Sequence, residues 1–428
     1  MYTVDMLLKR IDSGHYDRSF ARLYTNEIEK QRNRYRQAVL KFSEIYGSER
    51  KVVLFSAPGR TEIGGNHTDH NHGRVLAASV NLDIIAVASM SDKNVIRIKS
   101  EGFEEDTVLL DDLSAKQEDQ GRSSSLIRGL AEKFSNNNYK IGGFDAYTTS
   151  NVLKGSGLSS SAAFEVLVGT VLNHLYNNGN VGNVEIAKMA QYAENVHFGK
   201  PCGLMDQTAS AVGGIITIDF ADIKNPLIKK VDFNFADTGY NLCIVDTGGD
   251  HADLTHEYAS ITVDMKAVSK SLGVNYLRET DMDTLLKNLS LLRKKHGDRA
   301  VLRAIHFLRD NQRVSYQVKA LESGDFDKFL RLIIESGHSS FEYLQNVYSS
   351  CNANEQGLSL ALCLAQGMLD GKGAWRVHGG GFAGTTQNFV PSSLLPMFYS
   401  QIESVFGKGS CHVLTIRPVG GVCLDSLN

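Results

Sequence analysis

The sequence has little proline, no paired cysteines and no long apolar run. Its six prolines form no proline-rich stretch that would mark a linker between domains. The six cysteines are scattered and none form a C-x-x-C pair, which argues against a disulfide framework or a zinc site built on paired thiolates. No segment approaches the ~18 to 20 consecutive apolar residues that a membrane-spanning helix needs. The first twenty residues are interrupted by charges and do not resemble a signal peptide. We therefore expect a cytoplasmic protein.

Net charge is also nearly absent. A formal net charge of -3 gives no general electrostatic reason for binding nucleic acid or a membrane surface. What is present is the composition of an ordinary globular enzyme, with 42% hydrophobic and 22% charged residues. A length of 428 residues exceeds what one hydrophobic core usually supports, so we expect two or three structural units.

Helical and strand-like segments alternate irregularly along the chain. Apolar residues at helical spacing among many charges predict a helical N-terminal extension over residues 1–48. Strands are expected at 51–60 (ending at Pro58-Gly59), 75–89, 94–100, 142–152, 215–220, 241–247, 374–390 and 411–419. Helices are expected at 126–134, 161–175 and 184–196, with mostly helical structure over 258–347. Because this order has no strict βαβ repeat, it favours an α+β fold over a doubly wound sheet.

A glycine- and serine-rich turn opens the predicted helix at 161–175. The segment LKGSGLSSSAAFEVLVG (153–169) places a flexible turn before a helix start, whose first N–H groups have no intrahelical partner. Those donors and the helix dipole favour an anion such as a phosphate group. Serines also cap helices with no ligand present, so both interpretations stay open on physics alone. The lysine of a Walker A loop is absent.

A second glycine-rich segment, HGGGFAGTT (378–386), contains a formal G-x-G-x-x-G match at Gly379, Gly381 and Gly384. The run that follows is β-branched and strand-like, so the strand-to-helix context of a dinucleotide-binding oxidoreductase is missing. Glycines between two strands more often permit close approach of the backbone to another segment or to a ligand.

Two clusters of histidine and acidic residues raise the question of a metal site. One lies in APGRTEIGGNHTDHNHG (57–73), and the other comprises Asp250, His251, Asp253 and His256. Neither has the ligand spacing of a known zinc family. A polar loop that hydrogen-bonds a sugar uses the same donors and acceptors, and we favour that interpretation.

Taken in order, these motifs resemble those of the GHMP small-molecule kinases, and specifically of galactokinases. The first segment is similar to the galactokinase signature through Pro58-Gly59-Arg60, Gly65, His67-Thr68-Asp69 and Asn71-His72-Gly73. The second matches GLSSSAA through Gly157 to Ala163. A further stretch, GKPCGLMDQ (199–207), resembles the segment that holds the family's catalytic aspartate.

The resemblance implies a fold, a reaction and its participants. The expected architecture is a two-lobed α+β GHMP kinase fold with the active site between the lobes. We expect the extension at 1–48, an N-terminal lobe at 49–220 and a C-terminal lobe at 221–428. The expected reaction is ATP- and Mg²⁺-dependent phosphorylation of galactose at its anomeric hydroxyl, with the sugar and ATP as partners and neither nucleic acid nor a membrane involved.

The resemblance also assigns roles to residues. It makes Asp206 the base that accepts the proton of the sugar hydroxyl, with Arg60 beside it to stabilise charge on the transferred phosphoryl group. The implied Mg²⁺ ligands are Glu194 and either Ser160 or Ser161. The implied sugar contacts are Asn66, His67, Asp69, Gly203 and Tyr258. The implied ATP contacts are Gly155, Ser156, Gly157, Leu158, Ser159, Ser160, Ser161 and Ala162.

The first motif departs from the family pattern at several positions. Glu62 stands where asparagine is usual, Asn66 where an acid contacts the sugar's C6 hydroxyl, and His70 where tyrosine is usual. Asparagine at this position would remove repulsion against a C6 carboxylate, so a kinase for a C6-modified sugar such as galacturonate is an alternative. A sugar- and ATP-binding sensor without catalytic activity is a second alternative.

Overall fold

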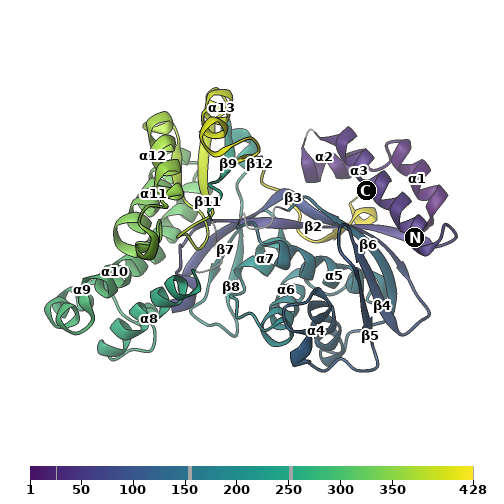
Figure 1. The fold of residues 1–428 in the computed structure, drawn as a ribbon, viewed down its shortest axis with the longest axis horizontal. Coiled ribbons are helices and arrows are strands. Elements are labelled where there is room, and N and C mark those ends of the chain that lie inside the picture. The colour runs from purple at the N-terminus through teal and green to yellow at the C-terminus, as the bar shows by residue number, and fades with distance from the viewer. Residues whose placement is uncertain (26, 153–156, 250–253, 428) are drawn as a thin grey trace.

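The computed structural model describes residues 1–25, 27–152, 157–249 and 254–427, which form two sheets with helices packed against them (Figure 1). The large sheet has the strand order β1-β2-β3-β6-β4-β5, with β13 beside β2 and with β7 joining β3 to β8. Its strands are β1 (Tyr2–Thr3), β2 (Lys51–Gly64), β3 (Arg74–Met90), β4 (Val95–Ser100), β5 (Glu105–Leu109), β6 (Phe144–Ser150), β7 (Ile215–Asp219), β8 (Leu227–Val231) and β13 (Val422–Cys423). All neighbours in this sheet are antiparallel except β4 and β6.

Helices cover both faces of the large sheet. Along β2, Val53 and Phe55 pack into a core with α4 to α7, whereas Leu54 and its partner Val87 on β3 pack against α1 to α3. This alternation follows from the two-residue period of a strand and explains why both strands are apolar almost throughout. The helices are α1 (Val4–Asp12), α2 (Asp17–Tyr24), α3 (Ile28–Tyr46), α4 (Ser123–Asn136), α5 (Ser160–Tyr176), α6 (Asn183–Tyr192) and α7 (Met205–Val212).

The prediction that the first strand ends at Pro58-Gly59 is wrong, because β2 continues to Gly64. Its pairing with β3 shifts register between Pro58 and Arg60, and such a bulge accommodates a proline that cannot donate to the ladder. Gly59 lies against the segment before α5, where an added Cβ would be 2.9 Å from the Leu158 carbonyl oxygen. The bulge therefore brings Arg60 next to the start of α5.

A buried ionic cluster joins the N-terminal helices, the large sheet and the C-terminal segment. The Asp83 carboxylate, which has no solvent exposure, receives hydrogen bonds from Arg34 on α3 (2.6 Å) and from Arg417 (3.1 Å). Burial alone would raise the pKa of Asp83, but the two guanidinium groups hold it below its usual value. Close by, β13 pairs antiparallel with β2 through Val422 and Ser56.

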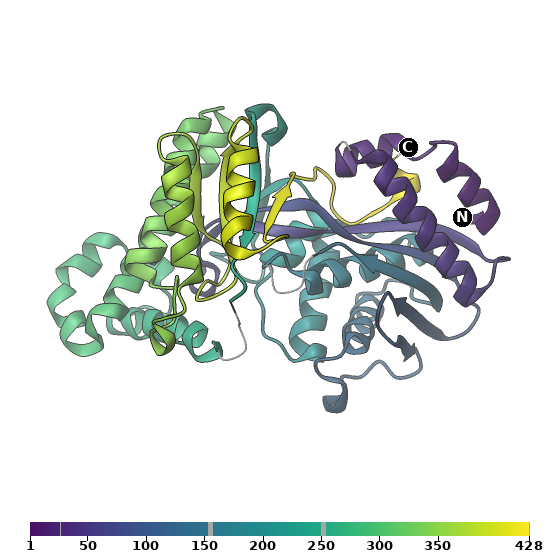
Figure 2. The same ribbon diagram turned by 45° about the horizontal axis from the view of Figure 1, so that its top comes forward.

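The second sheet has the order β10-β11-β9-β12 and lies beside the large sheet, away from the N-terminal helices (Figures 1 and 2). Its strands are β9 (Tyr240–Asp246), β10 (Ala374–Val377), β11 (Thr385–Pro391) and β12 (Cys411–Leu414). The helices of this half are α8 (Thr255–Ser271), α9 (Met282–Lys287), α10 (Leu289–Glu322), α11 (Phe326–Ser339), α12 (Gly357–Leu369) and α13 (Leu395–Phe406). The sequence analysis did not predict α12 and α13.

The two sheets and their helices confirm the α+β prediction. The division at residue 220 stays a prediction, and two strands beyond it, β8 and β13, belong to the large sheet. Within the described part of the chain, no helix combines the length and hydropathy required to span a membrane.

Candidate active site

Arg60 and Asp206 form a bidentate ion pair where β2, α5 and α7 meet. The Arg60 Nε donates to Asp206 Oδ1 at 2.6 Å and Nη2 donates to Oδ2 at 2.5 Å. The third nitrogen, Nη1, donates to the Gly157 carbonyl oxygen at the start of the α5 segment. Arg60 is 9% exposed, and the Asp206 side chain is 27% exposed. One guanidinium group therefore links a carboxylate that remains accessible to the turn before α5.

The ion pair fixes the charge state of Asp206. Burial alone would raise the pKa of this carboxyl, but the charge and hydrogen bonds of Arg60 outweigh burial and lower it below its usual value. A hydrogen bond from Ser159 acts in the same direction. Asp206 is thus ionised at neutral pH, as a group that accepts a proton must be.

The turn before α5 leads into a helix start, whose first backbone N–H groups have no partner within the helix. Gly157 has φ 71° and Ser159 has φ 56°, so the chain enters the helix through left-handed residues. α5 has 17 residues, and its first N–H groups, including those of Ser161 and Ala162, are suited to bind an anion. Of the predicted ATP contacts, Gly155 and Ser156 lie outside the described residues, whereas Gly157 to Ala162 lie together at this helix start.

A cavity of about 920 Å³ opens beside Ser160 and Ser161. Its wall combines apolar side chains with hydroxyl, amide and carboxylate groups from the large sheet and from α4 and α5. The lining residues are Lys30, Leu82, Ile84, Ser100, Glu101, Phe103, Asp106, Ser123, Leu126, Thr148, Ser150, Asn151, Val152, Ser160, Ser161, Phe164 and Phe198. A volume of this size with mixed lining suits a nucleoside next to the anion-binding turn.

The Ser161 hydroxyl lies close to the carboxylates of Glu194 and Glu165. Its hydroxyl donates to Glu194 Oε1 at 3.2 Å, and the Gln207 amide donates to both Glu194 (2.7 Å) and Glu165 (3.1 Å). Burial and the charge of Glu194 raise the pKa of Glu165 well above its usual range. Among the described residues, Glu165 Oε1 has no hydrogen-bond partner although it is buried. This oxygen-rich set fits a hard divalent cation, which would relieve the repulsion between the two carboxylates.

Of the predicted sugar-contacting residues, His67 and Tyr258 bond to the second glycine-rich segment, and Asp69 lies against Gly203. The His67 ring donates to the Gly380 carbonyl oxygen at 2.8 Å, and the Tyr258 hydroxyl donates to that of Gly381 at 3.0 Å. Asp69 lies against Gly203, where an added Cβ would be 2.8 Å from Asp69 Oδ2. Burial lowers the pKa of His67 to about 4, so its ring is neutral. The second glycine-rich segment thus permits close backbone approach, as predicted.

Asn66 differs from its predicted role as a sugar contact. Its side chain has no solvent exposure, and its amide donates to Glu62 (3.0 Å) and to the Gly379 carbonyl oxygen (2.7 Å). Its oxygen accepts from Ser340 (3.2 Å) and Asn346 (2.8 Å). With all four of these bonds made to the protein, Asn66 holds the loop in place and offers the sugar no free group.

Sequence reasoning missed several buried partners of the site. Arg376, with no solvent exposure, donates to Glu62 at 2.6 Å, which compensates the charge of that carboxylate. Glu62 lies next to the loop at 65–73, which carries the predicted sugar contacts His67 and Asp69 (the sugar-side loop). His378 lies between Thr61 (3.0 Å) and Thr385 (2.9 Å), and burial lowers its pKa to about 3. Glu165 lies one helical turn after Ser161, a spacing that could have indicated a shared site. Glu62 and Arg376 lie too far apart in the sequence for their spacing to indicate a contact.

Comparison with known proteins identifies the family. Residues 125–214 match the family model of the GHMP kinases N terminal domain, and residues 40–90 match the galactokinase galactose-binding signature. A galactokinase from Streptomyces coelicolor is 32% identical over 374 residues, which cover 86% of this chain and 91% of that protein. The chain belongs to the galactokinase family. A galactokinase from Lactobacillus helveticus is 29% identical over 381 residues, or 87% of this chain and 94% of that protein.

Solved structures support membership of the galactokinase family. The crystal structure of Lactococcus lactis galactokinase complexed with galactose superposes with a TM-score of 0.76 at 25% identity, covering 90% of this chain and 98% of that one. Methanococcus jannaschii mevalonate kinase shares the fold, with a TM-score of 0.61 at 12% identity and coverage of 86% and 98%. The predicted GHMP kinase fold and the prediction of a sugar kinase are confirmed.

Proposed function

We propose that this protein transfers the γ-phosphoryl group of ATP to the anomeric hydroxyl of galactose. The observation that carries the proposal is the Arg60–Asp206 ion pair, which lies between the anion-binding start of α5 and the polar residues of the sugar-side loop. The relatives named galactokinase, and the galactose in the Lactococcus lactis crystal structure, support galactose as the sugar.

The reaction uses the chain's charges rather than covalent chemistry on the protein. Asp206 accepts the proton of the anomeric hydroxyl, whose oxygen then bonds to the γ-phosphorus while the bond from that phosphorus to the bridging β-oxygen breaks and ADP leaves. Arg60 keeps Asp206 ionised and stabilises negative charge on the moving phosphoryl group. The N–H groups at the start of α5 hold the phosphates, and the cavity of about 920 Å³ accepts the nucleoside.

We assign a divalent cation, Mg²⁺ by its preference for oxygen ligands, to Ser161 and Glu194 with Glu165 nearby. When bound with the nucleotide, such a cation neutralises phosphate charge. Both serines line the nucleoside cavity, but Ser160 is the less favoured for this role, because Ser161 is the one of the two that is hydrogen-bonded to Glu194.

On the sugar side, we propose that Asp69 accepts hydrogen bonds from sugar hydroxyls, and that His67, Gly203 and Tyr258 complete the wall. Asn66 acts indirectly by fixing the loop that carries His67. Since Asn66 is fully engaged with the protein and Arg376 neutralises Glu62, neither residue gives a direct reason to prefer a C6 carboxylate over a C6 hydroxyl.

The decisive experiment is ADP release with Mg·ATP across galactose, galacturonate, N-acetylgalactosamine, arabinose and glucose. We expect turnover with galactose. Asp206→Asn should lower kcat by about 10²- to 10⁴-fold, while galactose still binds. Asp298→Asn is the matched control and should retain full activity, because this surface aspartate pairs with Arg293 alone among the described residues. Preference for galacturonate would reassign the substrate, and galactose binding without turnover in the unmodified protein would favour a sensor.

A further inference from the structure

A mixed cluster of metal-ligating side chains lies outside the catalytic site. Within the described residues, His256, Glu257 and Cys351 bring one ligand atom each to within 4.8 Å of one another. His256 and Glu257 belong to the first turn of α8, and Cys351 lies in the short 3-10 turn Ser350–Asn352. Spacing in sequence could not reveal this group, since Cys351 is remote in the chain from the other two.

The distance between two of the ligand atoms is the one expected at a tetrahedral metal centre. His256 Nε2 lies 3.4 Å from Cys351 Sγ. Bonds of about 2.0 Å from nitrogen and about 2.3 Å from sulfur to one tetrahedral zinc ion place those atoms roughly 3.5 Å apart. His256 and Cys351 are exposed, so an ion can reach them from solvent, whereas Glu257 is only 5% exposed.

A second layer of hydrogen bonds holds the ligands. Ser349 donates to Glu257 Oε1 at 2.8 Å and accepts from the Cys351 backbone N–H at 3.1 Å, so one hydroxyl orients both the carboxylate and the turn that carries the thiol. Such supporting bonds are typical of metal sites, where they fix ligand direction.

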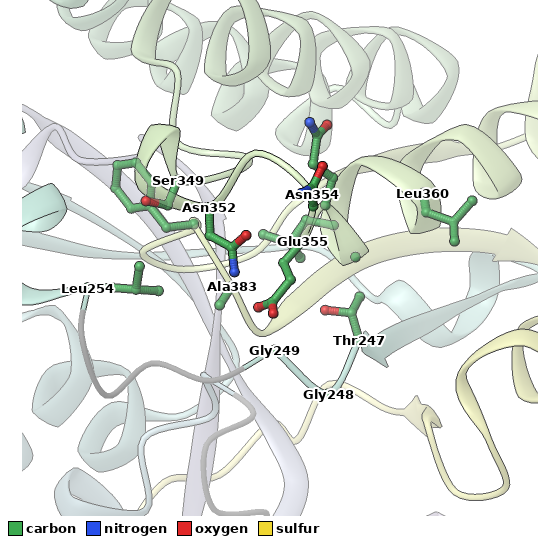
Figure 3. Close-up of a pocket in the computed structure, with 14 residues that line it drawn as sticks. Thr247, Gly248, Gly249, Leu254, Ser349, Asn352, Asn354, Glu355, Leu360 and Ala383 are labelled. Atoms are coloured by element: carbon green, nitrogen blue, oxygen red, sulfur yellow. The ribbon is translucent and has the colours of Figure 1, made fainter.

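An open volume adjoins the cluster. A cavity of about 580 Å³ is lined by Leu254, Ser349 and Asn352, the near neighbours of the three ligands in sequence. Figure 3 shows these three residues on one side of the cavity and Thr247 on the other. The cavity borders the cluster through these neighbours, and the exposure of His256 and Cys351 lets water serve as a fourth ligand, the arrangement found in sites with three protein ligands.

We propose that His256, Glu257 and Cys351 form a binding site for a thiophilic divalent cation such as Zn²⁺, separate from the cation that accompanies ATP. Imidazole and thiolate ligands select zinc over magnesium, which prefers oxygen. On coordination the Cys351 thiol gives its proton to solvent. The ion would link the 3-10 turn Ser350–Asn352 to His256, which lies two residues before Tyr258 on α8. The Tyr258 ring in turn packs against Phe382 in the second glycine-rich segment, with ring centroids 5.4 Å apart.

The test is titration of the full-length protein with Co²⁺ in the presence of excess Mg²⁺, followed by the near-ultraviolet thiolate-to-Co²⁺ absorption band and its displacement by Zn²⁺. We expect the band in the unmodified protein and in Cys363→Ser, which removes another exposed thiol on α12. Cys351→Ser should abolish it. His256→Ala and Ser349→Ala should each weaken Co²⁺ binding by at least about tenfold.

The same titration can overturn the proposal. Absence of a thiolate band in the unmodified protein would do so, as would a band that survives Cys351→Ser or disappears in Cys363→Ser. An unchanged affinity in His256→Ala would likewise exclude the imidazole as a ligand. None of these outcomes depends on kinase activity, so they are independent of the proposed reaction.

Discussion

Replacement of Arg60 by alanine tests the central ion pair most directly. The substitution leaves the Asp206 carboxylate in a site where burial raises its pKa and no guanidinium remains to lower it. The fraction of ionised base therefore falls, and activity should be lost at higher pH than in the unmodified protein. The acid limb of the kcat profile, which reports the base in the enzyme–substrate complex, should move to higher pH.

The size of the effect follows from the geometry. Removing one group that stabilises charge in a transition state raises the activation barrier by about 2.7 to 4 kcal/mol, and the lower end applies because the Asp206 side chain is 27% exposed. Since each 1.36 kcal/mol corresponds to a factor of ten, kcat near neutral pH should fall by roughly 10²-fold. Arg60→Lys keeps the charge but loses the bidentate contact, so kcat should fall only about tenfold and the acid limb of the pH profile should stay nearly in place.

The assay is steady-state ADP release at saturating galactose and Mg·ATP over a range of pH, with Asp298→Asn as the surface control. A melting temperature for each variant separates loss of fold from loss of chemistry. If Arg60→Ala kept the acid limb of the unmodified protein and a kcat within about threefold of it, Arg60 would not control the ionisation of Asp206 and the mechanism would be refuted.

Further predictions concern the cation, the sugar and the fold. Glu194→Gln should raise the Mg²⁺ concentration needed for half-maximal rate without changing the KM for the sugar, as Mg²⁺ titrations will show. Gly203→Ala should raise the KM for the sugar with little change in melting temperature, because the added Cβ would lie 2.8 Å from Asp69 Oδ2; steady-state kinetics measure this. Phe42→Ala should lower the free energy of unfolding, measured by urea unfolding, by about 3 to 5 kcal/mol, because Phe42 is fully buried between α3 and the large sheet. The value of kcat/KM should stay unchanged.

Much of the secondary structure followed from local pattern. The helix predicted at 161–175 is α5 (Ser160–Tyr176), because its apolar run and serine-rich start are signals within one segment. The missed helix α13 also carried local signals, a proline in its first turn and Gly407 after its end, which the sequence analysis did not use. Continuation of β2 past Pro58 depended on a bulge opposite β3, which a single strand's sequence does not reveal.

Within the site, the resemblance supplied Arg60 and Asp206, which form an ion pair, but not the buried partners of the neighbouring residues. The orientation of Asn66 depends on Ser340 and Asn346, which lie far away in sequence and reach it only after the second half of the chain has packed. Common residue types that lie so far apart in the sequence form no recognisable motif. The same holds for Cys351, whose neighbours in sequence indicate nothing about His256.

The cluster around Asp83 has a consequence for synthesis of the protein. Asp83 is fully buried on β3, yet one of its two guanidinium partners, Arg417, and the strand that pairs beside it, β13, emerge from the ribosome more than three hundred residues later. Until then a nascent chain has an edge of β2 without its neighbour and a buried carboxylate with only part of its charge compensation. The large sheet can therefore reach its final form only after Val422 has left the ribosome, and until then the part of the β2 edge that pairs with β13 is open to other strands.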